Sequence, residues 1–85
     1  MSELTVMRNI GREMARKLTA VGIDSPEKLR EAGSLQAWFQ LKTVFPGVCL
    51  VHLYALEGAI EDVEFNCLSE DKKRELKSFC DALRG

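Results

Sequence analysis

Apolar residues recur at helical spacing along most of this chain. One face of a helix over residues 12–21 carries the apolar residues Met14, Ala15, Leu18 and Val21. Polar residues fall on the other face, and Gly22 is a typical residue just beyond a helix end. This pattern predicts an amphipathic helix, preceded by a short first helix over residues 2–7.

Turn and cap residues divide the remaining apolar spacing into further helices. Ser25 and Pro26 provide a cap and a first-turn proline for a helix over residues 24–33. Ser34 is predicted to cap a helix over residues 34–45, and Ser69 is predicted to cap the last helix. We therefore expect an all-α fold, a compact bundle of five or six short helices in a single domain over residues 1–85.

Residues 48–62 form the most apolar segment. Its apolar positions cover more than half of a helical wheel, which is typical of a central helix packed from two sides. Gly58 costs about 1 kcal/mol of helix propensity relative to alanine, so we expect another helix to approach closely there. His52, the one histidine, falls in the apolar arc and is expected to be a core residue bonded to backbone.

The composition offers no catalytic, cofactor or metal site. No nucleophile and base are paired by spacing, and the acidic run over residues 57–71 lacks the spacing of a calcium loop. We expect that run to be a solvated face. The cysteines at positions 49, 67 and 80 form no zinc pattern and are expected to be reduced, small apolar residues, with a redox role for an exposed one as the alternative.

No apolar run approaches the roughly 20 residues of a membrane span, and the first residues lack the features of a secretory signal. A cytoplasmic, non-enzymatic protein is therefore expected. The net charge is −1, but residues 8–17 carry +3 and residues 57–71 carry −6. This distribution predicts a basic end and an acidic end.

The turn Asn9-Ile10-Gly11 is the main candidate binding site. A helix N-terminus leaves backbone N–H groups unpaired, and these can donate to a phosphate of double-stranded DNA. Additional positive charge would come from nearby arginines, namely Arg8, Arg12 and Arg16. The alternative is that the turn only joins two helices and that the arginines are solvated.

A second candidate is the aromatic pair Trp38-Phe39. The core can accept only one face of the helix that carries them, so one ring is expected to be partly exposed. An exposed aromatic ring can anchor a protein partner, although it can equally be ordinary surface.

The residues that carry a family resemblance extend over nearly the whole chain. The first group comprises Leu4, Met7, Asn9, Ile10, Gly11, Ala15, Leu18, Val21, Gly22 and Ile23, continuing through Ser25, Glu27, Leu29 and Gly33. The second group comprises Leu53, Ala55, Leu56, Gly58, Ala59 and Ile60, followed by Leu68, Lys72 and Leu76. The first pattern resembles a helix-hairpin-helix motif. Together they are similar to the C-terminal domain of the TfoX/Sxy regulators of bacterial natural competence.

The resemblance implies a helical domain with a helix-hairpin-helix-like N-terminal half, associated with the regulation of DNA-uptake genes. It also implies that the turn over residues 9–11 faces phosphate. Asn9 departs from the pattern, because DNA-binding hairpins usually carry a glycine there. The larger regulators have a separate N-terminal domain, which these 85 residues lack.

Two functions follow as hypotheses. The first is a regulatory or accessory module that touches DNA backbone weakly through the hairpin. The alternative is a protein–protein interaction module without nucleic-acid contact, which the net charge of −1 favours. DNA binding requires the hairpin arginines to share a face free of carboxylates, whereas protein binding predicts a contiguous apolar patch or a symmetric self-contact.

Overall fold

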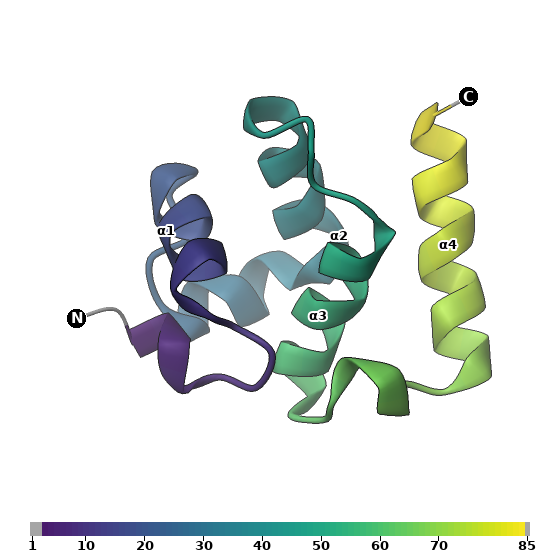
Figure 1. The fold of residues 1–85 in the computed structure, drawn as a ribbon, viewed down its shortest axis with the longest axis horizontal. Coiled ribbons are helices and arrows are strands. Elements are labelled where there is room, and N and C mark those ends of the chain that lie inside the picture. Colours follow the sequence, from purple (N-terminus) through teal and green to yellow (C-terminus); the bar gives the residue numbers. More distant parts are fainter. Residues whose placement is uncertain (1–2, 85) are drawn as a thin grey trace.

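The computed structural model describes residues 3–84, which contain four α-helices, two short 3₁₀ helices and no strand (Figure 1). The elements in chain order are η1 (Glu3–Val6), α1 (Arg12–Ala20), α2 (Pro26–Val44), α3 (Leu50–Glu61), η2 (Phe65–Cys67) and α4 (Glu70–Arg84). The predicted all-α class is confirmed. Among these residues no helix is both long and apolar enough to cross a membrane.

The expected number of five or six short helices is not confirmed, because the described residues contain four α-helices and two short 3₁₀ helices. The predicted first helix is the 3₁₀ helix η1, and its expected start at residue 2 lies outside the described residues. The two helices predicted over residues 24–33 and 34–45 together make up α2, which is not a single uninterrupted helix. Gly33 interrupts the helical backbone inside α2 with φ 83° and ψ 161°, so α2 is kinked there.

Several helix ends use the residues that the sequence indicated. Ser25 Oγ accepts a hydrogen bond from Lys28 N at 3.2 Å, and Ser69 Oγ accepts one from Lys72 N at 3.1 Å. Gly22 follows α1 with φ 89°, a left-handed conformation that glycine adopts without strain. These caps fix where α1, α2 and α4 begin or end.

Ser34 does not act as the predicted cap. Its side chain is buried inside α2, and its hydroxyl donates to Glu57 Oε1 at 2.5 Å. Glu57 lies on α3, so this hydrogen bond links the kinked part of α2 to the central helix. The hydroxyl therefore stabilises a tertiary contact instead of a helix end.

Helix α3 is central, as its apolar arc predicted. It contacts α2, η2 and α4, and α1 and α4 lie on opposite sides of the α2–α3 pair (Figure 1). Its buried face carries Leu53, Leu56, Gly58 and Ala59. The other fully buried large side chains are Leu4, Leu18, Leu29, Trp38, Leu41, Val48 and Leu76.

Candidate functional site

The turn between η1 and α1 is anchored to the distant segment that follows α3. Asn9 has φ 69°, a left-handed conformation that asparagine tolerates better than most residues. Its Nδ2 donates to Val63 O at 2.9 Å, and its Oδ1 accepts from Phe65 N at 3.3 Å. The Asn9 amide therefore faces the α3–η2 connection and does not face a phosphate.

Gly58 makes room for this amide. A Cβ on Gly58 would collide with Asn9 Nδ2, and it would lie 2.7 Å from Val63 O and 3.3 Å from Phe65 Cα. The close approach expected at Gly58 is present, but another helix does not make it. The Asn9 amide and the segment after α3 occupy the space, which corrects the prediction.

The other two residues of the turn differ in exposure. Ile10 is buried in the core, so its side chain is unavailable to a ligand. Gly11 is the exposed N-cap residue of α1, and it supplies no side-chain hydrogen bond to the first turn. Nothing lies within 4 Å of the position that a Gly11 Cβ would take. The most open residue of the turn is therefore Gly11, and the half-buried Asn9 borders the same surface hollow.

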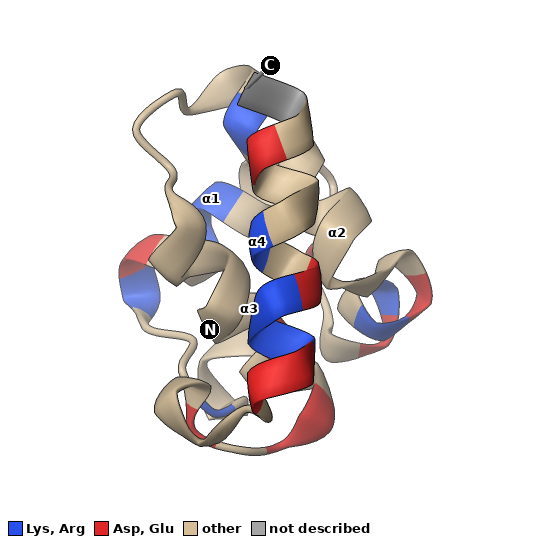
Figure 2. Cartoon of the chain, turned by 90° about the vertical axis from the view of Figure 1, so that its right-hand side faces the viewer, with Lys and Arg blue, Asp and Glu red and all other residues tan. Residues whose placement is uncertain are grey.

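Arg8 is engaged by the acidic segment. Its Nε lies 3.4 Å from Asp62 Oδ1, and its Nη1 lies 3.3 Å from Glu64 Oε1. These ion pairs bring Arg8, the first residue of the basic stretch over residues 8–17, against the acidic stretch over residues 57–71, so the predicted basic and acidic ends meet at this residue. On α4, too, acidic and basic positions alternate (Figure 2).

The remaining cations of the hairpin differ in their partners. Arg16 Nη2 lies 2.7 Å from Glu13 Oε2, and the hydrogen bond and charge of Arg16 lower the pKa of Glu13. Lys17 Nζ lies 5.6 Å from the centre of the Phe45 ring. Within residues 3–84, Arg12 is exposed and makes no ion pair or hydrogen bond through its guanidinium.

The two rings of the aromatic pair have separate roles. Trp38 is 1% exposed; its Nε1 donates to Cys49 O at 3.1 Å, and its ring packs edge-on against Phe79. Phe39 is 47% exposed. Trp38 therefore belongs to the core, and only Phe39 presents a substantial ring area to solvent.

Two shallow hollows meet at Phe39 on the outer side of α2. One continues to α4 and the other to the end of α1, and no ionisable side chain lines either hollow. We call this area the Phe39 surface. It consists of Ala20, Val21, Ala32, Leu35, Gln36, Phe39, Gln40, Thr43, Val44 and Phe79.

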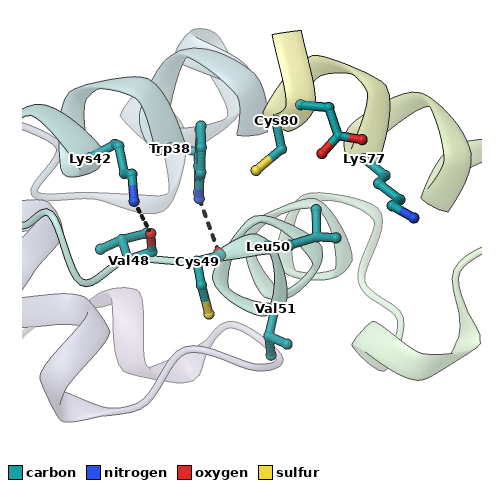
Figure 3. Close-up of a pocket in the computed structure, with 9 residues that line it drawn as sticks. Trp38, Lys42, Val48, Cys49, Leu50, Val51, Lys77 and Cys80 are labelled. Atoms are coloured by element: carbon teal, nitrogen blue, oxygen red, sulfur yellow. Dashed lines mark hydrogen bonds between the residues drawn. The ribbon is translucent and has the colours of Figure 1, made fainter. Parts of the chain in front are cut away.

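A separate groove of about 440 Å³ lies between the start of α3 and the second half of α4. Trp38 and Cys80 border its interior, as Figure 3 shows. Beside it, Lys42 Nζ donates to Val48 O at 3.0 Å and to Pro46 O at 2.8 Å. These bonds, with that of Trp38, hold the segment that leads into α3.

The three cysteines are free, but their surroundings differ. Cys80 is buried, as expected for a small apolar residue, whereas Cys49 and Cys67 are exposed. The described residues bring no three His, Cys, Asp or Glu side chains together as a metal-binding group. Cys80 therefore matches the expected small apolar residue, and Cys49 and Cys67 are exposed thiols, as in the alternative.

His52 has the predicted hydrogen bond to backbone. Its Nδ1 accepts from Cys49 N at 3.0 Å at the beginning of α3. The ring is half-buried and does not lie in the core. Partial burial and the charge of Lys17 both lower the pKa of His52, so its imidazole is neutral at pH 7.

Glu57 was not recognisable from the sequence as different from the other acidic residues. Its side chain is only 13% exposed, and it accepts the Ser34 hydroxyl and lies 3.9 Å from Lys72 Nζ. Burial by itself raises the pKa of Glu57. The hydrogen bonds with Glu61 and Ser34 and the charge of Lys72 lower this pKa by more than burial raises it, so the net shift is downward. The acidic run is therefore only partly the solvated face that was expected.

Comparison with known proteins places this fold in a family. The profile of the TfoX C-terminal domain matches residues 1–80. The chain belongs to the TfoX C-terminal domain family. That match covers both the hairpin and the central helix, the two parts that carried the resemblance.

Solved structures of similar proteins share the whole arrangement. An uncharacterized protein from Listeria monocytogenes, in a triclinic crystal form, matches with a TM-score of 0.94 and 38% identity, over 96% of this chain and 93% of that one. A protein of unknown function from the same organism, in a tetragonal form, matches with a TM-score of 0.87 and 39% identity, over 96% of each chain. A search of curated proteins finds no significant match.

Proposed function

We propose that this TfoX C-terminal domain is a non-enzymatic regulatory or accessory module of the cytoplasm that acts by binding a protein partner. The observation that carries the proposal is the uncharged Phe39 surface. These two adjoining hollows have no ionisable lining residue, whereas the groove beside Trp38 is lined by Lys42, Lys77 and Asp81. The role in competence regulation belongs to the same proposal and rests on family membership.

The chemistry of this surface defines the partner. A charged side chain docked in either hollow would lose water without meeting an opposite charge, which costs free energy. An apolar side chain would instead bury the exposed parts of Phe39 and Val44, which are 47% and 55% exposed. The partner is therefore a protein segment with an apolar anchor flanked by uncharged polar groups, which can bond to Gln36 and Gln40.

The hairpin supports protein binding over DNA binding. Three carboxylates lie beside its arginines, because Arg8 pairs with Asp62 and Glu64, and Arg16 pairs with Glu13. A DNA backbone would have to displace or tolerate these negative charges. The Asn9 amide is also occupied by internal hydrogen bonds.

The test begins with a photo-crosslinking amino acid placed at position 39 in cells, and the same amino acid at Val6 as the control site. Val6 is 83% exposed, lies on η1 and does not line the Phe39 surface. A protein captured only from position 39 is then purified and titrated against this domain by calorimetry. Saturable binding that is lost in Phe39→Asp and retained in Val6→Asp supports the proposal.

Equal binding by both variants would overturn the Phe39 surface as the contact. Capture at position 39 without binding between purified components would do the same. Sedimentation velocity of the purified domain tests whether the partner is instead a second copy of this chain. A dimer that dissociates in Phe39→Asp would assign the surface to self-association.

DNA backbone binding is the second candidate, and Arg12 is the observation that favours it. Arg12 is exposed and unpaired among the described residues, and the neighbouring Gly11 leaves open space at the N-terminus of α1. A phosphate there would meet both the guanidinium and backbone N–H groups. This candidate uses fewer residues of the hairpin than the sequence indicated.

Fluorescence anisotropy of a labelled duplex at about 50 and 200 mM salt tests this second candidate. Arg12→Ala should weaken any binding and reduce its salt slope by about one, while Arg30→Ala, an exposed arginine of α2, should leave it unchanged. The double variant Asp62→Asn/Glu64→Gln frees Arg8 and should strengthen binding. Absence of binding at low salt, in the double variant as well, would exclude the hairpin as a phosphate site.

A further inference from the structure

We propose that the groove between the start of α3 and the second half of α4 binds a small carboxylate with a compact apolar body. The groove has a volume of about 440 Å³. Binding sites for small molecules commonly enclose about 300–1,000 Å³ and combine apolar side chains with a few polar groups. This groove shares no lining residue with the Phe39 surface, so it is separate from the site of the proposed function.

The interior of the groove is apolar. Figure 3 shows Trp38, Cys80 and Leu50 arranged around it. Trp38 and Cys80 are 1% and 8% exposed and lie at its inner side, whereas Val51 is 54% exposed at its opening. An apolar body placed between them would cover part of Val51 and remove apolar area from water, which is favourable.

The inner wall of the groove is held in place before any ligand binds. Trp38 Nε1 donates to Cys49 O at 3.1 Å, and Lys42 Nζ donates to Val48 O at 3.0 Å. The Trp38 ring also packs edge-on against Phe79. A wall that is already ordered loses little conformational entropy on binding. Because its polar groups have partners inside the protein, the wall favours an apolar body over a polar one.

The charges around the groove favour an anion. Among the described residues that line it, two are lysines, Lys42 from α2 and Lys77 from α4, and one is acidic, Asp81. Neither lysine forms an ion pair within residues 3–84. The two hydrogen bonds of Lys42 go to neutral backbone carbonyls and leave one of its three N–H groups to donate.

The start of α3 adds to this positive potential. Cys49, Leu50 and Val51 line the groove and are the N-cap and the first two residues of this 12-residue helix. The N-terminal end of a helix carries a partial positive charge that attracts a carboxylate. The lysines, which come from other helices, supply the full charges. The carboxylate therefore lies at the opening, near Lys77, and the apolar body lies against Trp38.

Three probes with the same ring system test this assignment, namely 2-naphthoate, its uncharged amide and the cationic 2-naphthylmethylamine. Each is titrated into the complete ¹⁵N-labelled protein at pH 7 and followed by two-dimensional NMR. The chain has one tryptophan, so the signal of the Trp38 Nε1–H group reports on the groove without ambiguity. We expect 2-naphthoate to shift this signal with a dissociation constant of about 1 mM. The side-chain amide signal of Gln40, on the Phe39 surface, should not move.

The charge of the probe should decide its affinity. The amide should bind about threefold more weakly than 2-naphthoate, the loss expected of one exposed charge contact, and the amine more weakly still. Lys77→Gln should weaken 2-naphthoate about threefold and leave the amide unchanged. Lys28→Gln is the matched control, because Lys28 is exposed on α2 and does not line the groove.

Val51→Glu tests the position of the probe. It removes an apolar contact and places a negative charge at the opening, so 2-naphthoate should bind about tenfold more weakly. Position 51 lies in the first turn of α3, where an acidic residue is favourable, so we expect the fold to persist. Circular dichroism of the variant verifies this.

Three results would overturn the proposal. Absence of a saturable Trp38 shift with every probe would show that the groove is not a binding site. Equal or tighter binding of the amide or the amine, or equal effects of Lys77→Gln and Lys28→Gln, would show that the charges do not select an anion. Unchanged 2-naphthoate binding in folded Val51→Glu would place the probe elsewhere. None of these results depends on whether the Phe39 surface binds a protein.

Discussion

The side-chain amide of Asn9 occupies the space that a side chain on Gly58 would take. The two residues are 49 positions apart, on the N-terminal turn and the central helix α3. Because Gly58 has no Cβ, Asn9 can reach past α3 and bond to both Val63 O and Phe65 N. One glycine and one asparagine therefore join the hairpin to the segment after α3.

Gly58→Ala should destabilise the fold although alanine is the better helix former. Alanine adds about 1 kcal/mol of helix propensity, but overpacking against Asn9 and the Val63 carbonyl costs about 1–3 kcal/mol. We expect a lower free energy of unfolding in urea. Gly47→Ala is the control, because nothing lies within 4 Å of its Cβ position. A more stable Gly58→Ala protein would contradict the close packing.

Asn9→Asp should cost about 1–3 kcal/mol of unfolding free energy, because it replaces a half-buried donor to Val63 O with an acceptor. The added charge would also lie beside Asp62 and Glu64, which already surround Arg8. Asn9→Gly keeps the left-handed backbone and removes only the side-chain bonds, so its loss should be smaller. Urea unfolding of the two variants gives this comparison, and equal losses would mean that the carboxylate introduced at position 9 meets no added repulsion from Val63 O or from Asp62 and Glu64.

The sequence was sufficient for the helices and insufficient for the contacts that decide the site. Caps such as Ser25 and Ser69 act within one turn, so their role can be read locally. The partners of Asn9 and Arg8 lie 54 to 56 positions away along the chain, and the partner of Ser34 lies 23 positions away. No sequence periodicity specifies such distant pairs. The hairpin therefore resembled an open phosphate site in sequence and is largely occupied in the fold.

The break in α2 is a feature that the sequence indicates. Gly33 is a typical residue just beyond a C-cap and predicts the end of one helix. In the structure it has φ 83° and ψ 161°, a non-helical conformation that separates the two helical parts of α2. Ser34, next to this break, donates to Glu57 on α3, a tertiary contact that the sequence does not specify.

Arg8→Gln should reduce stability by less than about 1 kcal/mol at low salt and by less still at high salt, because its ion pairs are exposed. Arg30→Gln on the exposed side of α2 provides the matched control. Thermal or urea unfolding at two salt concentrations measures both. A loss that does not change with salt would instead indicate packing of the Arg8 stem.

Ser34→Ala should destabilise by about 1–3 kcal/mol at neutral pH, because it removes a donor from the mostly buried Glu57 carboxylate. A carboxyl whose folded pKa is lowered contributes stability above its unfolded pKa, and that contribution is lost as pH falls through the folded pKa. The effect of Ser34→Ala should therefore shrink in the acid range. Ser78→Ala, on the exposed side of α4, should show no such trend. A destabilisation that stays constant with pH would mean that the hydroxyl matters through packing alone.

Trp38 and Phe39 should respond differently to substitution although they are adjacent. Trp38→Phe leaves the Cys49 carbonyl without its Nε1 donor and opens space in the core, so we expect a loss of about 2–4 kcal/mol. Phe39→Gln replaces a half-exposed ring and should change stability by less than about 1 kcal/mol. Urea unfolding followed by circular dichroism compares them without relying on tryptophan fluorescence. A large loss in Phe39→Gln would assign Phe39 to the core and remove the basis for a partner surface around it.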